Sequence, residues 1–177
     1  MTTRIIVLNG GSSSGKTAIA HCLQAILPDP WLRLGVDDLV EALPPSLTDS
    51  GAGVAFGGQG EVSVGEGFIA MEAAWLTGIA AMVRAGARVI VDDVFLSGGT
   101  SQARMRLHFA SIEVLWVGVR CEGAIAAGRE IARGDRVPGM AASQADMVHR
   151  GVRYDLEVDS GRMPAIDCAR MIAVRVG

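Results

Sequence analysis

Apolar residues along the chain form short runs that are separated by longer stretches with helical spacing. Runs typical of strands occupy residues 5–8, 31–36, 88–94, 113–119 and 154–159. Five strands that alternate with helices favour a parallel sheet with right-handed crossovers. The pattern therefore predicts an α/β fold with one five-stranded parallel sheet and helices on both of its faces.

The stretches between these runs repeat apolar residues every three or four positions, which is typical of helices that cover a sheet. After residue 16, Ile19, Cys22 and Leu23 share one such face. A longer helix is predicted from 68 to 85, with Gly86 as its stop. The residues of this helix that we expect in the core are Phe68, Met71, Trp75, Ile79 and Met82.

A phosphate-binding loop is indicated directly after the first strand, where the chain reads Gly10-x-x-x-x-Gly15-Lys16-Thr17 before a helix. Glycines let the backbone curl its N–H groups toward an anion, and the helix dipole favours negative charge there. Lys16 is expected to reach the terminal phosphates and the Thr17 hydroxyl to bind Mg²⁺. A serine- and glycine-rich turn without a ligand is the alternative. The predicted nucleotide-binding residues are Gly10, Gly11, Ser12, Ser13, Ser14, Gly15, Lys16 and Thr17.

Carboxylates stand at the ends of two predicted strands, where ligands gather in open α/β sheets. Asp37 follows the strand at 31–36 and is the candidate general base, whereas Asp38 could serve only as a helix N-cap. Asp92 and Asp93 fall within the run at 88–94, and neighbours on a strand point to opposite faces. We favour Asp92 for the magnesium site. Asp93 is then a substrate contact or a structural acceptor.

Residues 44–67 are the least regular part of the sequence. Pro44 and Pro45 break the preceding helix, and seven of the residues from 51 to 67 are glycine. A loop of this length in a compact domain is usually functional or mobile. We expect it to cover a substrate pocket with Phe56 and its valines as apolar wall. The alternative is a surface excursion, such as a hairpin, without ligand contact.

An arginine-rich segment, 129–140, follows the fourth predicted strand. Arg133 lies on a predicted helix, and the glycines and proline after it free Arg136 to move. In a phosphoryl-transfer enzyme such a segment would act as a lid whose guanidinium groups neutralise the transferring phosphate and exclude water. A solvated basic face that pairs with Glu130 and Asp135 is the alternative.

Composition narrows the classes of function. The 177 residues suit one domain, residues 1–177, and the net charge of −3 with a pI near 5.6 argues against a nucleic-acid scaffold or a polybasic membrane binder. Fifteen cationic residues are arginine and the single lysine is Lys16, a compact point charge suited to a phosphate site. We expect a small-molecule partner, and an oligomer is compatible with the sequence.

Cys22, Cys121 and Cys168 are odd in number and widely spaced among apolar residues, as expected of reduced thiols rather than a disulfide framework or a zinc site. The sequence begins without a charged-then-apolar leader, and no apolar run is expected to reach the length of a membrane span. The expected location is the cytoplasm, where ATP is available. Mg²⁺ is the only metal that the motifs require.

Several segments together carry a family resemblance. They are LNGGSSSGKT at 8–17, GVD at 35–37, GARVIVDDVFL at 86–96, LWVGVRC at 115–121 and ARGDR at 132–136. Over essentially its whole length the chain resembles chloramphenicol 3-O-phosphotransferase, a self-resistance kinase. This combination is far more specific than the phosphate-binding loop alone.

The resemblance implies a P-loop kinase of the nucleoside-monophosphate-kinase-like fold that transfers the γ-phosphate of ATP to the primary hydroxyl of the antibiotic. By similarity, Asp37 matches the proposed base, Lys16 and Thr17 the phosphate and magnesium contacts, and Arg133 with Arg136 the lid. Another small hydroxylated metabolite or a nucleotide is an alternative acceptor. A nucleotide-binding regulatory protein is the alternative from another class, although it would leave Asp37 without a task.

Overall fold

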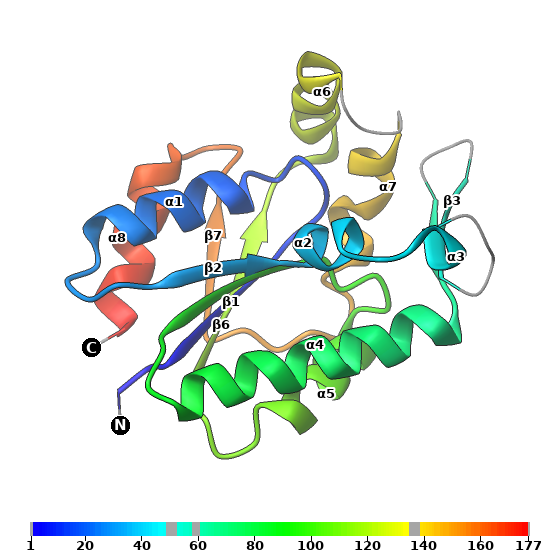
Figure 1. Cartoon of the computed structure of the whole chain (residues 1–177). Coiled ribbons are helices and arrows are strands. Elements are labelled where there is room, and N and C mark those ends of the chain that lie inside the picture. The colour runs from blue at the N-terminus through cyan, green and yellow to red at the C-terminus, as the bar shows by residue number, and fades with distance from the viewer. Residues whose placement is uncertain (1, 49–52, 58–60, 135–138, 177) are drawn as a thin grey trace.

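The computed structural model describes residues 2–48, 53–57, 61–134 and 139–176. Its centre is a five-stranded parallel sheet with the strand order β2-β5-β1-β6-β7, which confirms the predicted sheet (Figure 1). The strands are β1 (Ile5–Asn9), β2 (Leu32–Gly35), β5 (Val89–Asp93), β6 (Val114–Arg120) and β7 (Leu156–Asp159). A separate antiparallel hairpin consists of β3 (Val54–Phe56) and β4 (Val62–Val64).

Eight helices occur among the described residues, and the larger ones cover both faces of the sheet (Figure 1). They are α1 (Lys16–Ile26), α2 (Val36–Glu41), α3 (Pro45–Thr48), α4 (Glu66–Arg84), α5 (Gly99–His108), α6 (Gly123–Arg133), α7 (Met140–Met147) and α8 (Ala165–Val176).

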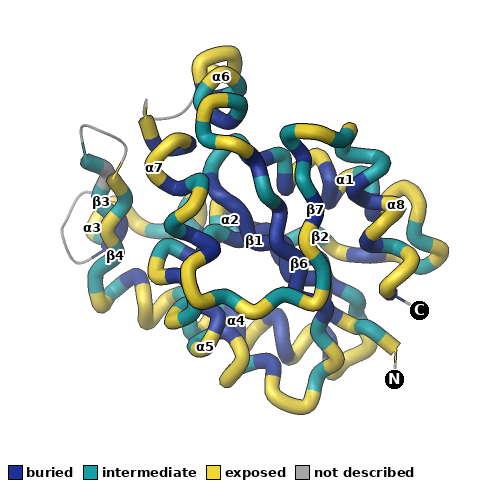
Figure 2. Tube along the Cα trace, turned by 180° about the vertical axis from the view of Figure 1, so that it is seen from behind, coloured by how far each residue is buried: buried dark blue, intermediate teal, exposed yellow. Residues whose placement is uncertain are grey.

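The two faces of the sheet carry separate apolar cores, because successive residues of a strand point to opposite sides. On β1, Ile6 and Leu8 pack with α1 and α8, whereas Ile5 and Val7 pack with α4 and α5. All five side chains of β1 are fully buried, and Figure 2 shows the strands as a buried centre between exposed helix surfaces. These cores fix the strand ends, and with them the loops that carry polar residues.

Helix α4 buries part of the predicted apolar face, since Phe68 and Ile79 are buried and Trp75 packs against the core. Leu76, Ile79 and Val83 are buried against the sheet, whereas Met71 and Met82 are exposed to 41% and 37%. Leu76, Ala80 and Val83, which the predicted set left out, are buried as well, and these residues lie in the second half of α4, which contacts the sheet. Its first half contacts the hairpin through Phe68.

Helix α4 also corrects the expectation that no apolar stretch reaches the length of a membrane span. Among the described residues it is the one helix long and apolar enough to cross a membrane by length and composition. A core helix of a globular fold passes the same test. Leu76, Ile79 and Val83 of α4 are buried against strand residues, although only 28% of its apolar window is buried in all.

Candidate active site

The loop at 10–15 joins β1 to α1 at the carboxyl edge of the sheet, and its backbone requires glycine. Gly15 has a φ of +87°, and a Cβ on Gly10 would lie 2.6 Å from the carbonyl oxygen of Val119. Ser13 also has a positive φ, 56°. Gly15 caps α1 without a side-chain hydrogen bond. The first N–H groups of α1 are therefore available to an anion.

Lys16 and Thr17 converge with Asp92 beneath this loop. The Lys16 Nζ donates a 2.9 Å hydrogen bond to the carbonyl of Gly11 and lies 3.9 Å from the Asp92 carboxylate. The Thr17 hydroxyl donates to the other Asp92 oxygen at 2.7 Å. Lys16 is only 7% exposed, so its side chain is largely shielded from water. This grouping of an ammonium, a hydroxyl and a carboxylate was predicted from the two motifs.

The chemistry of these residues suits the binding of a nucleoside triphosphate together with a magnesium ion. The Ser13 hydroxyl is buried without a hydrogen-bond partner and lines the cavity, as a phosphate-binding hydroxyl would. Thr17 and Asp92 offer the oxygen ligands that Mg²⁺ prefers. In the described part of the chain, no cluster of three or more histidine, cysteine, aspartate or glutamate side chains could hold a metal by itself. A magnesium ion here would complete its shell with phosphate oxygens and water.

The two carboxylates at the end of β5 have different surroundings. Asp92 lies beside Lys16, whereas Asp93 accepts a 2.6 Å hydrogen bond from the Val94 N–H and lies near Glu72 of α4. Burial raises the pKa of Asp93 from 3.8 to about 7, and the negative charge of Glu72 adds to the effect. Asp93 is therefore partly protonated near neutral pH, and its carboxyl can both donate and accept hydrogen bonds.

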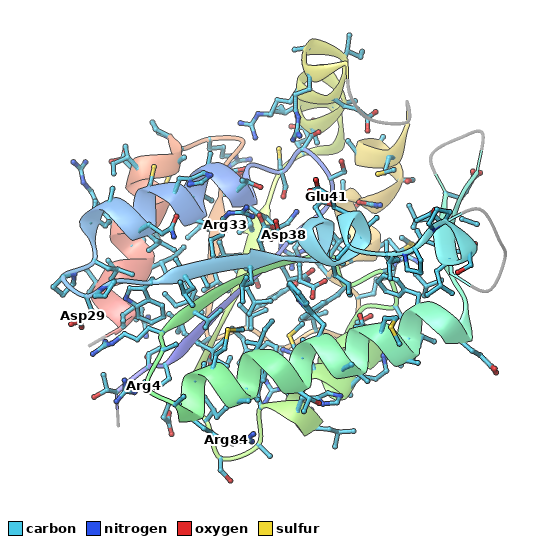
Figure 3. The ribbon with its side chains drawn as sticks, viewed as in Figure 1. Arg4, Asp29, Arg33, Asp38, Glu41 and Arg84 are labelled. Carbon is cyan, nitrogen blue, oxygen red and sulfur yellow. The ribbon has the colours of Figure 1, made fainter. Side chains whose placement is uncertain are left out.

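Asp37 lies in the first turn of α2, because that helix begins at Val36 and not after Asp38, as an N-cap role for Asp38 would require. Asp38 is not the N-cap; Gly35 is, and an Asp38 oxygen accepts the N–H of Gly35 at 2.5 Å. Asp38 also lies 3.5 Å from Arg33, and Figure 3 shows the two side chains together where β2 meets α2. Asp37 itself lines the cavity below the phosphate-binding loop.

One cavity of about 510 Å³ connects these groups. Its apolar wall includes Val54, Val62 and Val64 of the hairpin, so part of the 44–67 segment lines the pocket as the sequence suggested. The side chain of Phe56 lies outside the described part of the structure. The hairpin packs through Val54 on Leu39 and Phe68, which ties α2 to α4. The remaining apolar lining residues are Ala18, Val36, Val40, Phe68, Val94, Leu96, Ala132 and Met140.

The arginine-rich segment lies above the phosphate-binding loop. Arg129 donates a 2.7 Å hydrogen bond to the carbonyl of Ser160, and Arg133 lines the cavity. Arg136 falls within residues 135–138, which lie outside the described residues. The alternative interpretation placed Glu130 on a solvated basic face. Glu130 is instead buried, and it accepts hydrogen bonds from the N–H groups of Gly139 and Ala141 at 2.8 Å. It holds the start of α7.

Sequence reasoning did not single out three polar residues that line this cavity. Gln144 accepts the Ser12 N–H at 2.8 Å, and Arg104 donates to Glu72 at 3.2 Å. Glu72 carried a weak signal, since it interrupts an otherwise apolar helix. Nothing in the local sequence marks Gln144 or Arg104, because their roles depend on contacts across more than thirty residues.

Comparison with known proteins agrees with this geometry. The sequence model of one family, described as chloramphenicol phosphotransferase-like protein, matches residues 3–177. The chain belongs to this family. A Mycobacterium tuberculosis H37Rv protein described as "Putative O-phosphotransferase" is 33% identical over 180 residues, which cover 94% of this chain and 79% of the relative. The protein is thus an enzyme of a phosphotransferase family.

Solved structures share the fold at low sequence identity. A sugar kinase from Janibacter sp. HTCC2649 superposes with a TM-score of 0.72 and 17% identity, covering 99% of this chain and 96% of the other. The Deinococcus radiodurans tunicamycin resistance protein gives a TM-score of 0.68 at 19% identity, with the same coverage. These likenesses place the chain in the P-loop kinase fold.

Proposed function

We propose that this family member is an ATP-dependent O-phosphotransferase that transfers the γ-phosphate to the primary hydroxyl of chloramphenicol or a related small alcohol. The observation that carries the proposal is that Lys16, Thr17 and Asp92 share one cavity with Asp37. A phosphate-binding end and a carboxylate in one cavity are what transfer to a hydroxyl requires. We further propose that residues 1–177 act as one kinase unit in the cytoplasm.

At the phosphate-binding end, the N–H groups of residues 10–17 and the start of α1 would bind the triphosphate. Lys16 would leave its contact with Gly11 and engage the terminal phosphate oxygens. Thr17 and Asp92 would hold Mg²⁺, which when bound neutralises charge on the β- and γ-phosphate oxygens. The close approach of the Thr17 hydroxyl to the Asp92 carboxylate supports this assignment, because it brings two oxygen ligands together.

At the other end, Asp37 would orient the acceptor hydroxyl and accept its proton as the bond to phosphorus forms. The transition state of phosphoryl transfer is loose, so positioning by Asp37 contributes alongside its basicity. The apolar hairpin wall, with Val54 and Val62, would exclude water from the acceptor. Arg133 would neutralise charge on the transferring phosphate, and the family resemblance extends this role to Arg136.

The decisive experiment is mass spectrometry of chloramphenicol incubated with the purified protein, ATP and Mg²⁺. We expect a product heavier by one phosphoryl group with the wild type and none with Lys16→Ala. Thermal denaturation of Lys16→Ala checks that the variant is folded. An unchanged antibiotic beside tight ATP binding would reject chloramphenicol and direct the search to other small alcohols.

A further inference from the structure

A residue of α7 holds the backbone of the phosphate-binding loop. The Ser12 N–H donates a 2.8 Å hydrogen bond to the Oε1 of Gln144, which is 132 positions away in the chain. The backbones also come close here, since a Cβ on Gly11 would lie 3.2 Å from the Cβ of Gln144. Figure 1 shows α7 beside the turn that joins β1 to α1. Gln144 is 3% exposed and lines the cavity, so its side chain belongs to the wall of the site.

The contact with Ser12 fixes which way the Gln144 amide faces. A backbone N–H can only donate, so the side-chain atom that meets it is the carbonyl oxygen, and the amide nitrogen with its two donors points elsewhere. Helix α7 is anchored near both ends, by the buried Glu130 at its start and by Asn9, which donates to the Val148 carbonyl at 2.8 Å. The amide of Gln144 is therefore presented to the cavity in a fixed orientation.

Lys16 holds the same peptide unit of the loop from its other end. Its Nζ donates to the Gly11 carbonyl at 2.9 Å, and the Ser12 N–H belongs to the same peptide bond. In the proposed reaction Lys16 moves from Gly11 to the terminal phosphate oxygens, which brings those oxygens close to this peptide and to Gln144. Among the described residues, the buried hydroxyl of Ser13 has no hydrogen-bond partner, as expected where a ligand would supply one.

We propose that Gln144 is a further phosphate-binding residue, whose oxygen holds Ser12 and whose amide nitrogen donates a hydrogen bond to the γ-phosphate of the nucleotide. This inference rests on the proposed phosphotransferase activity and adds a contact from α7 to its nucleotide site. The loop N–H groups bind the phosphate chain of ATP and of ADP alike, whereas Gln144 binds only the phosphate that is transferred. Gln144 thus favours the substrate nucleotide over the product nucleotide.

Calorimetric titrations with AMPPNP and with ADP, each with Mg²⁺, test the inference without an acceptor. The ratio of the two affinities measures what the γ-phosphate contributes to binding. In Gln144→Glu the carboxylate still accepts the Ser12 N–H, but it has no donor and adds a negative charge. We expect the affinity for AMPPNP to fall at least about tenfold, as for loss of a hydrogen bond to a charged group, and that for ADP to change less than about threefold. Equal changes in both affinities would overturn the proposal.

A second variant, Gln144→Leu, separates the lost donor from the added charge. Leucine fills similar space but neither donates nor accepts, so the Ser12 N–H loses its partner as well. We expect the ratio of AMPPNP to ADP affinity to fall about tenfold again, and the thermal midpoint to fall below that of Gln144→Glu. A merely structural role would weaken both nucleotides equally in Gln144→Leu and spare both in Gln144→Glu, and either result would overturn the proposal.

Gln24→Glu is the matched control for the change of charge. Gln24 lies near the far end of α1, where its amide donates to the Trp31 carbonyl at 2.7 Å. The same substitution at this position adds the same negative charge away from the phosphate-binding loop. The ratio of AMPPNP to ADP affinity should therefore stay within about twofold of wild type, because charges at this distance are screened by salt. A tenfold fall in Gln24→Glu would overturn the assignment of the effect to Gln144.

The role of Gln144 and the identity of the acceptor fail separately. Unchanged chloramphenicol together with the expected nucleotide affinities would reject the antibiotic as acceptor and keep Gln144 in the phosphate site. Phosphorylation of chloramphenicol by Gln144→Glu at the wild-type rate, with an unchanged affinity for AMPPNP, would keep the phosphotransferase and overturn the role of Gln144.

Discussion

The hydroxyl of Thr17 donates a 2.7 Å hydrogen bond to the carboxylate of Asp92, which joins the first turn of α1 to the end of β5. The two residues are 75 positions apart, yet β1 and β5 are neighbouring parallel strands and end at the same edge of the sheet. The magnesium site that we propose can therefore form only when the central strands are in register. Activity and magnesium dependence should both depend on this contact.

Replacement of Asp92 by asparagine should weaken use of magnesium. The change removes the negative charge beside Thr17 but keeps the shape of the side chain, and loss of such a ligand or supporting carboxylate typically costs about 10- to 100-fold in metal affinity or activity. Initial rates measured against Mg²⁺ concentration should show a higher half-saturation point. Thr17→Ser should stay near wild type and Thr17→Val should resemble Asp92→Asn. An unchanged magnesium curve in Asp92→Asn would remove Asp92 from the metal site.

Asp37→Asn should lower kcat by about 10²- to 10⁴-fold, the range typical of general acid–base groups, with little change in KM for ATP. The amide can still occupy the space of Asp37 but cannot accept the proton. Steady-state kinetics with the established acceptor measure both constants. Asp38→Asn is the matched control, because Asp38 supports the start of α2 and should affect stability more than kcat. Retention of most turnover by Asp37→Asn would contradict the role.

The sequence predicted those residues of the site that belong to short, contiguous sequence patterns. The strand, glycine loop and helix around Lys16 form a contiguous motif, and Asp92 ends an apolar run whose strand lies beside β1. Glu72 and Arg104 could not be paired in advance, because their contact depends on how α4 and α5 pack together. The exposure of Met71 and Met82 on α4 has the same origin, since helical spacing alone does not determine which side chains of a helix meet the sheet.

Glu130→Ala should destabilise the fold by about 2 kcal/mol, because two buried N–H groups at the start of α7 would lose a charged acceptor. Urea denaturation measures the free energy of unfolding, and Glu157→Ala, which removes a half-exposed carboxylate, serves as the control. Since α7 carries Gln144, which contacts Ser12, KM for ATP should rise as well. If Glu130→Ala unfolded at the same urea concentration as the wild type, the start of α7 would not depend on the Glu130 carboxylate.

A buried network beside the phosphate-binding loop predicts a pH effect on stability. Asn9 donates to the Tyr154 hydroxyl at 2.6 Å, and that hydroxyl lies 2.6 Å from the His149 Nδ1. Burial, reinforced by Arg120, lowers the pKa of His149 from 6.5 to about 4. Folded His149 thus stays neutral over a range in which the unfolded chain binds a proton.

As the pH falls from 6.5 to 4, the unfolded state gains this proton and the folded state does not, so His149 should cost up to about 3 kcal/mol of stability. Above pH 6.5 both states are neutral and the cost disappears. Urea unfolding at several pH values should show wild type losing stability faster than His149→Gln across this window, because the variant has no imidazole to titrate. Parallel curves for the two proteins would show that His149 titrates alike in the folded and unfolded states, and that the network does not hold it neutral.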